Sequence, residues 1–212
     1  MQRIDVIGVT CESAPPRQRK GVSMKVETGT VTILRISEVP RLDPIRVTLD
    51  NGELGKGRIT IECYSKAWSA YWGAMSDRTV EQFFVDCGND YLIGNLSPGL
   101  YPISPSGETL EKDAKRVIRH RRKGIGEWRD MPLTDEAAME LMDRVSALGH
   151  CNGESSAWEN SSLLIDIYGQ DWYCIAKCEG PNHEYKYLER ICDAVREALK
   201  TQAAAKEGAQ QG

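Results

Sequence analysis

Alternating hydrophobic and polar residues mark a hairpin in the first half of the chain. Ile45, Val47 and Leu49 are separated by polar residues, and the same period of two returns at 59–63 after a glycine-rich turn. Successive side chains of a strand point to opposite faces, so this pattern predicts an antiparallel hairpin with one buried face. The β-branched segment 30–37 predicts a further strand.

The aromatic segment 66–75 fits two patterns. Trp68, Tyr71 and Trp72 recur at the spacing of a helix, whereas Trp68 and Trp72 also fit the period of two of a strand. We expect a strand, because aromatic residues dominate and Gly73 would interrupt a helix. The segment 58–96 as a whole holds the densest group of aromatic residues, which predicts that it organises the core.

Apolar residues at helical spacing predict four helices, and two later segments, 163–168 and 172–176, are expected to be short strands joined at Gly169. A further short strand is expected at 4–7. The first helix is capped by Asp77 and has the apolar stripe Val80, Phe83, Phe84 and Cys87, and the second has the stripe Leu110, Ala114, Val117 and Ile118. The third follows Thr134 with the stripe Ala138, Leu141, Met142 and Val145, and the last has the stripe Leu188, Ile191, Cys192, Val195 and Leu199.

These elements indicate an α+β fold, an antiparallel sheet with packed helices, in which two small α/β lobes joined by a basic helix are one arrangement. Three prolines and two glycines in 97–107 suggest a boundary. The expected parts are an N-terminal extension 1–22, a hairpin-plus-helix lobe 23–104, a basic helix and linker 105–132, a helix-strand-strand-helix lobe 133–201 and a flexible tail 202–212.

Charge is unevenly distributed along the chain. The net charge is −4, but 112–123 contains seven Lys/Arg and one Asp, so the remaining residues carry −10. A basic helical face binds nucleic-acid phosphates or an acidic protein surface, or is simply solvated. Trp128 follows this helix, and Trp and Arg often dominate binding energy at interfaces, although burial is an alternative for this Trp. The predicted partner or nucleic-acid site is Lys112, Lys115, Arg116, Arg119, Arg121, Arg122 and Trp128.

A zinc site is an open alternative in the second half. Cys174, Cys178 and His183 lie at short spacings downstream of Cys151. Zinc is usually held by four Cys or His ligands, but no second paired-cysteine motif is present, and ordinary packed thiols are the competing interpretation. We therefore expect no metal or other cofactor.

No motif indicates a catalytic centre. The three histidines adjoin no nucleophile motif, and the glycines at 52, 55 and 57 fit a hairpin turn and lack the Lys-Ser/Thr ending of a phosphate-binding loop. The chain has seven unevenly spaced cysteines, and neither a secretory signal nor an apolar membrane-spanning run is found in it. We therefore expect a cytoplasmic protein with free thiols.

The stretch ITIECYSKAWSAYWGAM, followed by DRTVEQFF, resembles uncharacterised accessory proteins of tailed bacteriophages, and the C-terminal EYKYLERICDAVREALK resembles their closing helix. The resemblance covers about 58–96 and 184–200 and carries no active-site residues. It implies a protein that binds and redirects or blocks host or defence machinery inside the bacterial cell.

Three functions follow as hypotheses. The first is a non-enzymatic binding protein that modulates or inhibits a host or defence protein complex acting on nucleic acid. The second is direct nucleic-acid binding through the basic helix, and the third is an enzyme whose site is assembled from distant residues. An exposed Trp68 or Trp72 would make the outer sheet face a rival binding surface. Neither the target nor the oligomeric state follows from the sequence.

Overall fold

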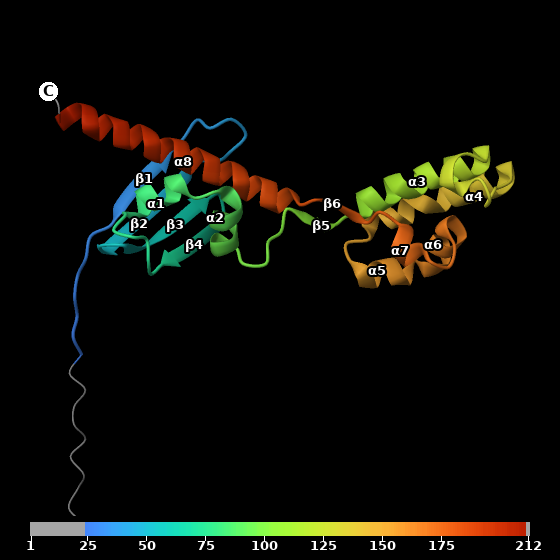
Figure 1. Ribbon diagram of the computed structural model, residues 1–212, viewed down its shortest axis with the longest axis horizontal. Coiled ribbons are helices and arrows are strands. Elements are labelled where there is room, and N and C mark those ends of the chain that lie inside the picture. The colour runs from blue at the N-terminus through green and yellow to red at the C-terminus, as the bar shows by residue number, and fades with distance from the viewer. Residues whose placement is uncertain (1–23, 211–212) are drawn as a thin grey trace, which may run out of the picture.

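A computed structural model describes residues 24–210 of the chain, and the expected strand at 4–7 lies outside them. The chain forms two lobes with separate hydrophobic cores, joined by a two-stranded ribbon, so the molecule is elongated (Figure 1). The predicted α+β class is confirmed: a four-stranded antiparallel sheet carries helices, and a second lobe is entirely helical.

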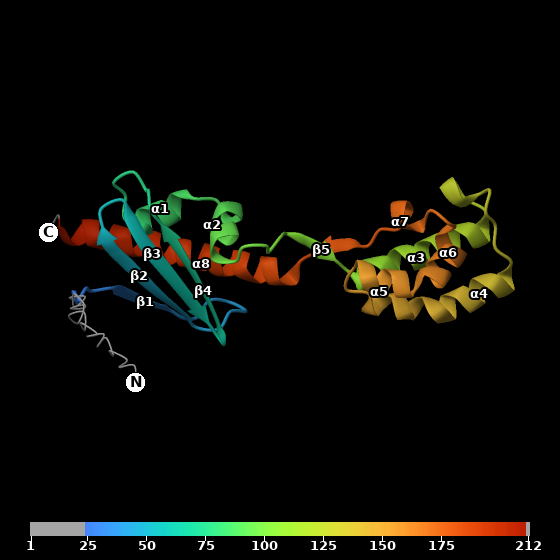
Figure 2. The same ribbon diagram turned by 90° about the horizontal axis from the view of Figure 1, so that it is seen from below.

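The sheet lobe has strand order β1-β2-β3-β4, with neighbours antiparallel throughout. Figure 2 shows helices on one face of this sheet only. The predicted hairpin and the strand interpretation of 66–75 are both confirmed. The elements of this lobe are β1 (Thr32–Ile36), β2 (Ile45–Glu53), β3 (Lys56–Cys63), β4 (Lys66–Trp72), α1 (Val80–Asp86), α2 (Asn89–Leu96) and α8 (His183–Gln210).

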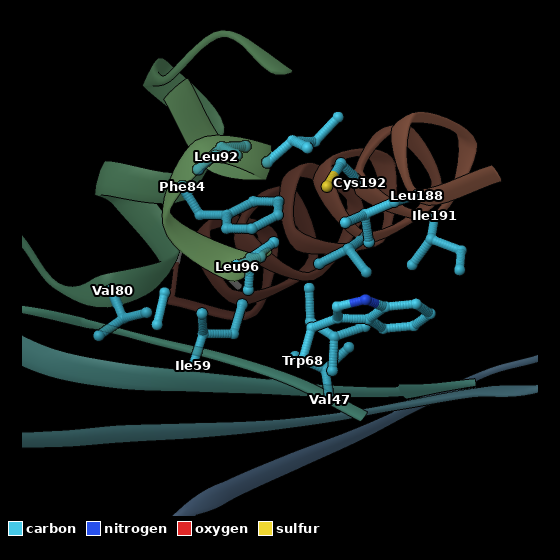
Figure 3. Close-up of a cluster of buried hydrophobic side chains, with 14 of the residues drawn as sticks. Val47, Ile59, Trp68, Val80, Phe84, Leu92, Leu96, Leu188, Ile191 and Cys192 are labelled. Carbon is cyan, nitrogen blue, oxygen red and sulfur yellow. The ribbon is translucent and has the colours of Figure 1, made fainter. Parts of the chain in front are cut away.

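The core of the sheet lobe lies between the sheet and its three helices (Figure 3). Val47, Ile59 and Trp68 come from the strands, and Phe84 and Leu188 come from α1 and α8. Trp68 and Trp72 are both buried on this inner face, so the condition for a rival tryptophan surface on the outer face is not met. Helix α1 begins at a capping box between Thr79 and Gln82, two residues after the predicted cap Asp77.

The helical lobe is inserted between α2 and α8 of the sheet lobe. The ribbon strands β5 (Ile103–Pro105) and β6 (Glu179–Pro181) lead into and out of it. Its elements are α3 (Gly107–Lys123), the 3₁₀ turn Gly126–Trp128, α4 (Asp135–Arg144), the 3₁₀ segment Val145–His150, α5 (Glu154–Glu159), α6 (Ser161–Tyr168) and α7 (Trp172–Ile175).

Two predictions about the second half were wrong. The segments 163–168 and 172–176 are helical rather than extended. In α6, Leu163, Leu164, Ile167 and Tyr168 are buried at i, i+1, i+4 and i+5, which is a helical stripe despite the β-branched residues. The predicted lobe 133–201 also differs from the structure, because α8 packs on the sheet of the first lobe and the basic helix α3 belongs to the helical core.

Gly57 lets β3 approach β2 and α1 closely, and its replacement tests this packing. A Cβ there would lie 2.5 Å from the carbonyl oxygen of Asp50 and overlap Val80. We expect Gly57→Ala to lower the free energy of unfolding by about 1–3 kcal/mol, as overpacking does. Gly94→Ala in α2 is the matched control, because a Cβ there meets open space and should stabilise by about 0.5–1 kcal/mol. Equal urea midpoints for the two variants would contradict this packing.

The phenol of Tyr185 on α8 gives the sheet lobe a pH dependence. It donates a hydrogen bond to Asp90 of α2, which raises the pKa of Tyr185 to about 12, with burial adding to the effect. A raised folded-state pKa stabilises the fold fully below pH about 10, the ordinary tyrosine value, and this contribution is lost as the pH rises through 12.

We therefore expect the urea midpoint to fall between about pH 10 and 12 more in the native chain than in Tyr185→Phe. The exposed Tyr101 provides the control, and Tyr101→Phe should follow the native chain. An identical alkaline loss in native protein and Tyr185→Phe would show that the bond to Asp90 contributes nothing.

Candidate protein-binding site

The basic helix α3 is largely neutralised by its neighbours. Four of the predicted binding residues form ion pairs with nearby carboxylates. The charge of these residues is therefore balanced locally, although exposed pairs add little stability. Among the described residues, Arg119 and Lys123 are exposed cations of α3 without an ion pair. The pairs are Lys112–Glu108, Lys115–Glu111, Arg116–Asp113 and Arg122–Asp135.

Arg121 is a structural residue of the helical core. Its side chain is 7% exposed, and its guanidinium donates to the backbone carbonyls of Met131, Asp166 and Ile167 at 2.6–2.7 Å. Burial lowers the pKa of Arg121, because desolvation penalises the charged form. The prediction that Arg121 contacts a partner is wrong, because its donors are used inside the lobe.

Trp128 is likewise buried, at 4% exposure, and packs edge-on against Tyr168 with ring centroids 5.8 Å apart. Tyr168 donates to Asp113 at 2.9 Å, and Asp113 also accepts from Arg116. Burial, followed by the charge of Asp113, raises the pKa of Tyr168. This network fixes α3 against α6, so Trp128 serves the core rather than an exposed face.

The charge of the helical lobe as a whole opposes nucleic-acid binding. Residues 103–181 contain ten Lys/Arg and fourteen Asp/Glu, a net charge of −4. Within 145–176 there is no Lys or Arg and there are four carboxylates. Phosphate binding is driven by positive charge, so the net negative charge of this lobe weighs against it.

An exposed aromatic group lies in that acidic segment. Trp158 of α5 and Tyr173 of α7 are 49% and 59% exposed, and their rings stack with centroids 6.2 Å apart at an interplanar angle of 22°. Trp172 lies beneath them and packs edge-on against Trp158 at 4.9 Å. We call Trp158, Trp172 and Tyr173 the aromatic patch. Large exposed aromatics supported by a buried one are typical of protein-binding surfaces.

The sequence offered one signal for this patch. Trp158 lies in ESSAWENSS, where every residue around it except Ala157 is polar or charged. A tryptophan without apolar neighbours at helical spacing has no complete core face to join, so its exposure could be anticipated. The position of Tyr173 could not, because 172–176 was expected to be a strand.

The residues of the possible zinc site are not brought together. Cys151 is buried in the helical core, whereas Cys174 and Cys178 are exposed. Within residues 24–210, no group of three or more His, Cys, Asp or Glu is placed to hold a metal ion.

Burial raises the pKa of Cys192 to about 12, so this thiol stays protonated at neutral pH and is a poor nucleophile.

Comparison with known families supplies the wider assignment. The α+β chain with its inserted helical lobe is a phage protein, because the model of a phage family, Phage_phiTE_072, matches residues 24–201. The chain belongs to this family, which agrees with the bacteriophage resemblance seen in 58–96 and 184–200. No curated protein and no solved structure gave a significant match. In the described part of the chain, none of the helices is long and apolar enough to cross a membrane.

Proposed function

We propose that this phage protein is a non-enzymatic binding protein. Acting in the bacterial cytoplasm, it engages and modulates a host or defence protein complex that works on nucleic acid. The aromatic patch is the observation that carries the proposal. Trp158 and Tyr173 keep about half of their surface exposed although a buried Trp172 lies beside them. Such rigid aromatic side chains offer a large contact area at a low cost in conformational entropy.

The electrostatics support a protein partner over nucleic acid. The patch lies in the segment 145–176, which has no Lys or Arg and has four carboxylates, of which Asp166 is paired with Arg144 of α4. A phosphate backbone is repelled by such a surface, whereas the basic surface of a protein that handles nucleic acid is attracted to it.

Affinity capture from bacterial lysate, with and without nuclease, tests this function. We expect a defined protein complex to be retained in equal amounts after nuclease treatment, because the contact is between proteins. The complex should also persist at raised salt, since an interface with an aromatic centre is less salt-sensitive than phosphate binding. Retention that disappears with nuclease would favour direct nucleic-acid binding through Arg119 and Lys123 instead.

A further inference from the structure

A hollow of about 490 Å³ shares helix α7 with the aromatic patch. Its apolar lining residues are Trp128, Met131, Tyr168 and Ile175. The carboxylates of Glu127 and Asp171 also line it. We infer that this hollow, here called the α7 socket, receives an arginine side chain of the partner protein. This inference rests on the proposed function, because it names the chemistry that the partner presents beside the patch.

The walls of the α7 socket suit a flat cation. Met131 and Ile175 are 40% and 42% exposed along it, whereas the rings of Trp128 and Tyr168 lie behind them at 4% and 2% exposure. A guanidinium group is planar and weakly hydrated, so it loses less on contact with an apolar wall than an ammonium group, which is held more strongly by water. The wall chemistry therefore favours arginine over lysine.

The polar groups of the α7 socket have the matching charge. Asp171 makes no ion pair among the described residues, and Glu127 is only loosely paired, with Arg116 at 3.9 Å. Both of these side chains are exposed. A guanidinium fork donates two parallel hydrogen bonds to a carboxylate, which makes an unpaired Asp an effective acceptor.

Two cations that contact lining residues of the α7 socket, Arg116 at Glu127 and Arg121 at Met131, are already occupied. Arg116 binds Asp113 through two nitrogens at 2.8 and 3.1 Å. Arg121 gives its donors to three backbone carbonyls. An anionic occupant would find neither guanidinium free, whereas a cationic one finds the carboxylates at Glu127 and Asp171. The charge arrangement therefore selects a cation.

Methyl NMR with N-acetyl-L-arginine amide tests the α7 socket. We expect saturable shifts of the Met131 and Ile175 methyl groups in the millimolar range. N-acetyl-L-citrulline amide has the same shape without the charge and should cause no saturable shift. Asp171→Asn combined with Glu127→Gln should weaken the arginine response by about fivefold or more. Glu136→Gln with Glu140→Gln on α4 is the matched control and should leave it unchanged.

The possible outcomes separate the two proposals. Equal shifts with the citrulline compound, or none with the arginine compound, would overturn the α7 socket while leaving partner capture through the aromatic patch intact. Arginine-dependent shifts in a protein that captures no partner would support the socket and count against the proposed function.

Discussion

Replacing Trp158 and Tyr173 together by alanine is expected to weaken binding of the captured partner by on the order of 100-fold or more. Truncating one aromatic residue at the centre of an interface to alanine typically costs about 2 kcal/mol or more of binding free energy, although such losses are not additive. Both rings are about half exposed in the free protein, so they have surface left to bury. Calorimetric titration of the purified partner with each variant measures the effect.

The controls for this prediction are exposed aromatics elsewhere. Tyr64 and Tyr101 are 84% and 69% exposed and lie outside the helical lobe. Their alanine variants should bind like the native chain. Tyr173→Ala alone keeps Trp158 in contact with Trp172, so a folding defect is less of a concern in this variant. Its affinity for the partner should still fall at least about tenfold. Full binding by the double variant would remove the aromatic patch as the site.

Arg121→Met is expected to lower the free energy of unfolding of the helical lobe by about 3–5 kcal/mol. The guanidinium bonds to the carbonyls of Met131, Asp166 and Ile167, and Met fills the space without supplying donors. Buried carbonyls left without partners each cost about 1–3 kcal/mol, which makes the loss large even if water replaces one bond. Urea unfolding followed by tryptophan fluorescence and circular dichroism measures it.

Arg119→Met is the matched control, two residues earlier on the same helix and exposed. It should change stability by less than about 0.5 kcal/mol, as surface substitutions usually do. If the two variants unfold alike, Arg121 is not the structural residue that its hydrogen bonds indicate.

The sheet lobe could be predicted from the sequence because its signals are local. The period of two in 45–50 and 58–63 specifies the hairpin, and Trp68 and Trp72 continue it with the same face inward. The apolar stripe of α8 was equally clear from the sequence, but the element against which this stripe packs was not. An apolar stripe states that a face is buried and does not state against which lobe, so the closing helix was assigned to the second lobe.

The helical lobe was harder because its elements are short. Helices α5 to α7 have four to eight residues. In segments this short, the hydrophobic pattern of a helix cannot be told from that of a buried strand. The family resemblance over 58–96 and 184–200 was confirmed, and both segments lie in the sheet lobe.

Of the candidate site, only the exposure of Trp158 could be predicted, because the number of charged residues in a segment does not give the net charge that the folded surface presents. Seven cations in 112–123 suggested a basic face, but carboxylates one helical turn away and on α4 neutralise four of them. Arg121 points into the core. The acidic aromatic surface formed by α5 and α7 depends on bringing Trp158 next to Tyr173, fifteen positions further along the chain.

Hydrogen exchange of the native chain, free and bound to its captured partner, tests most directly whether the aromatic patch is the binding surface. We expect slower exchange on binding in 154–159 and 170–176, with the outer sheet face and the exposed face of α3 unchanged. Protection confined to 115–123 or to the strands β1–β4, with 154–176 exchanging as in the free protein, would contradict it.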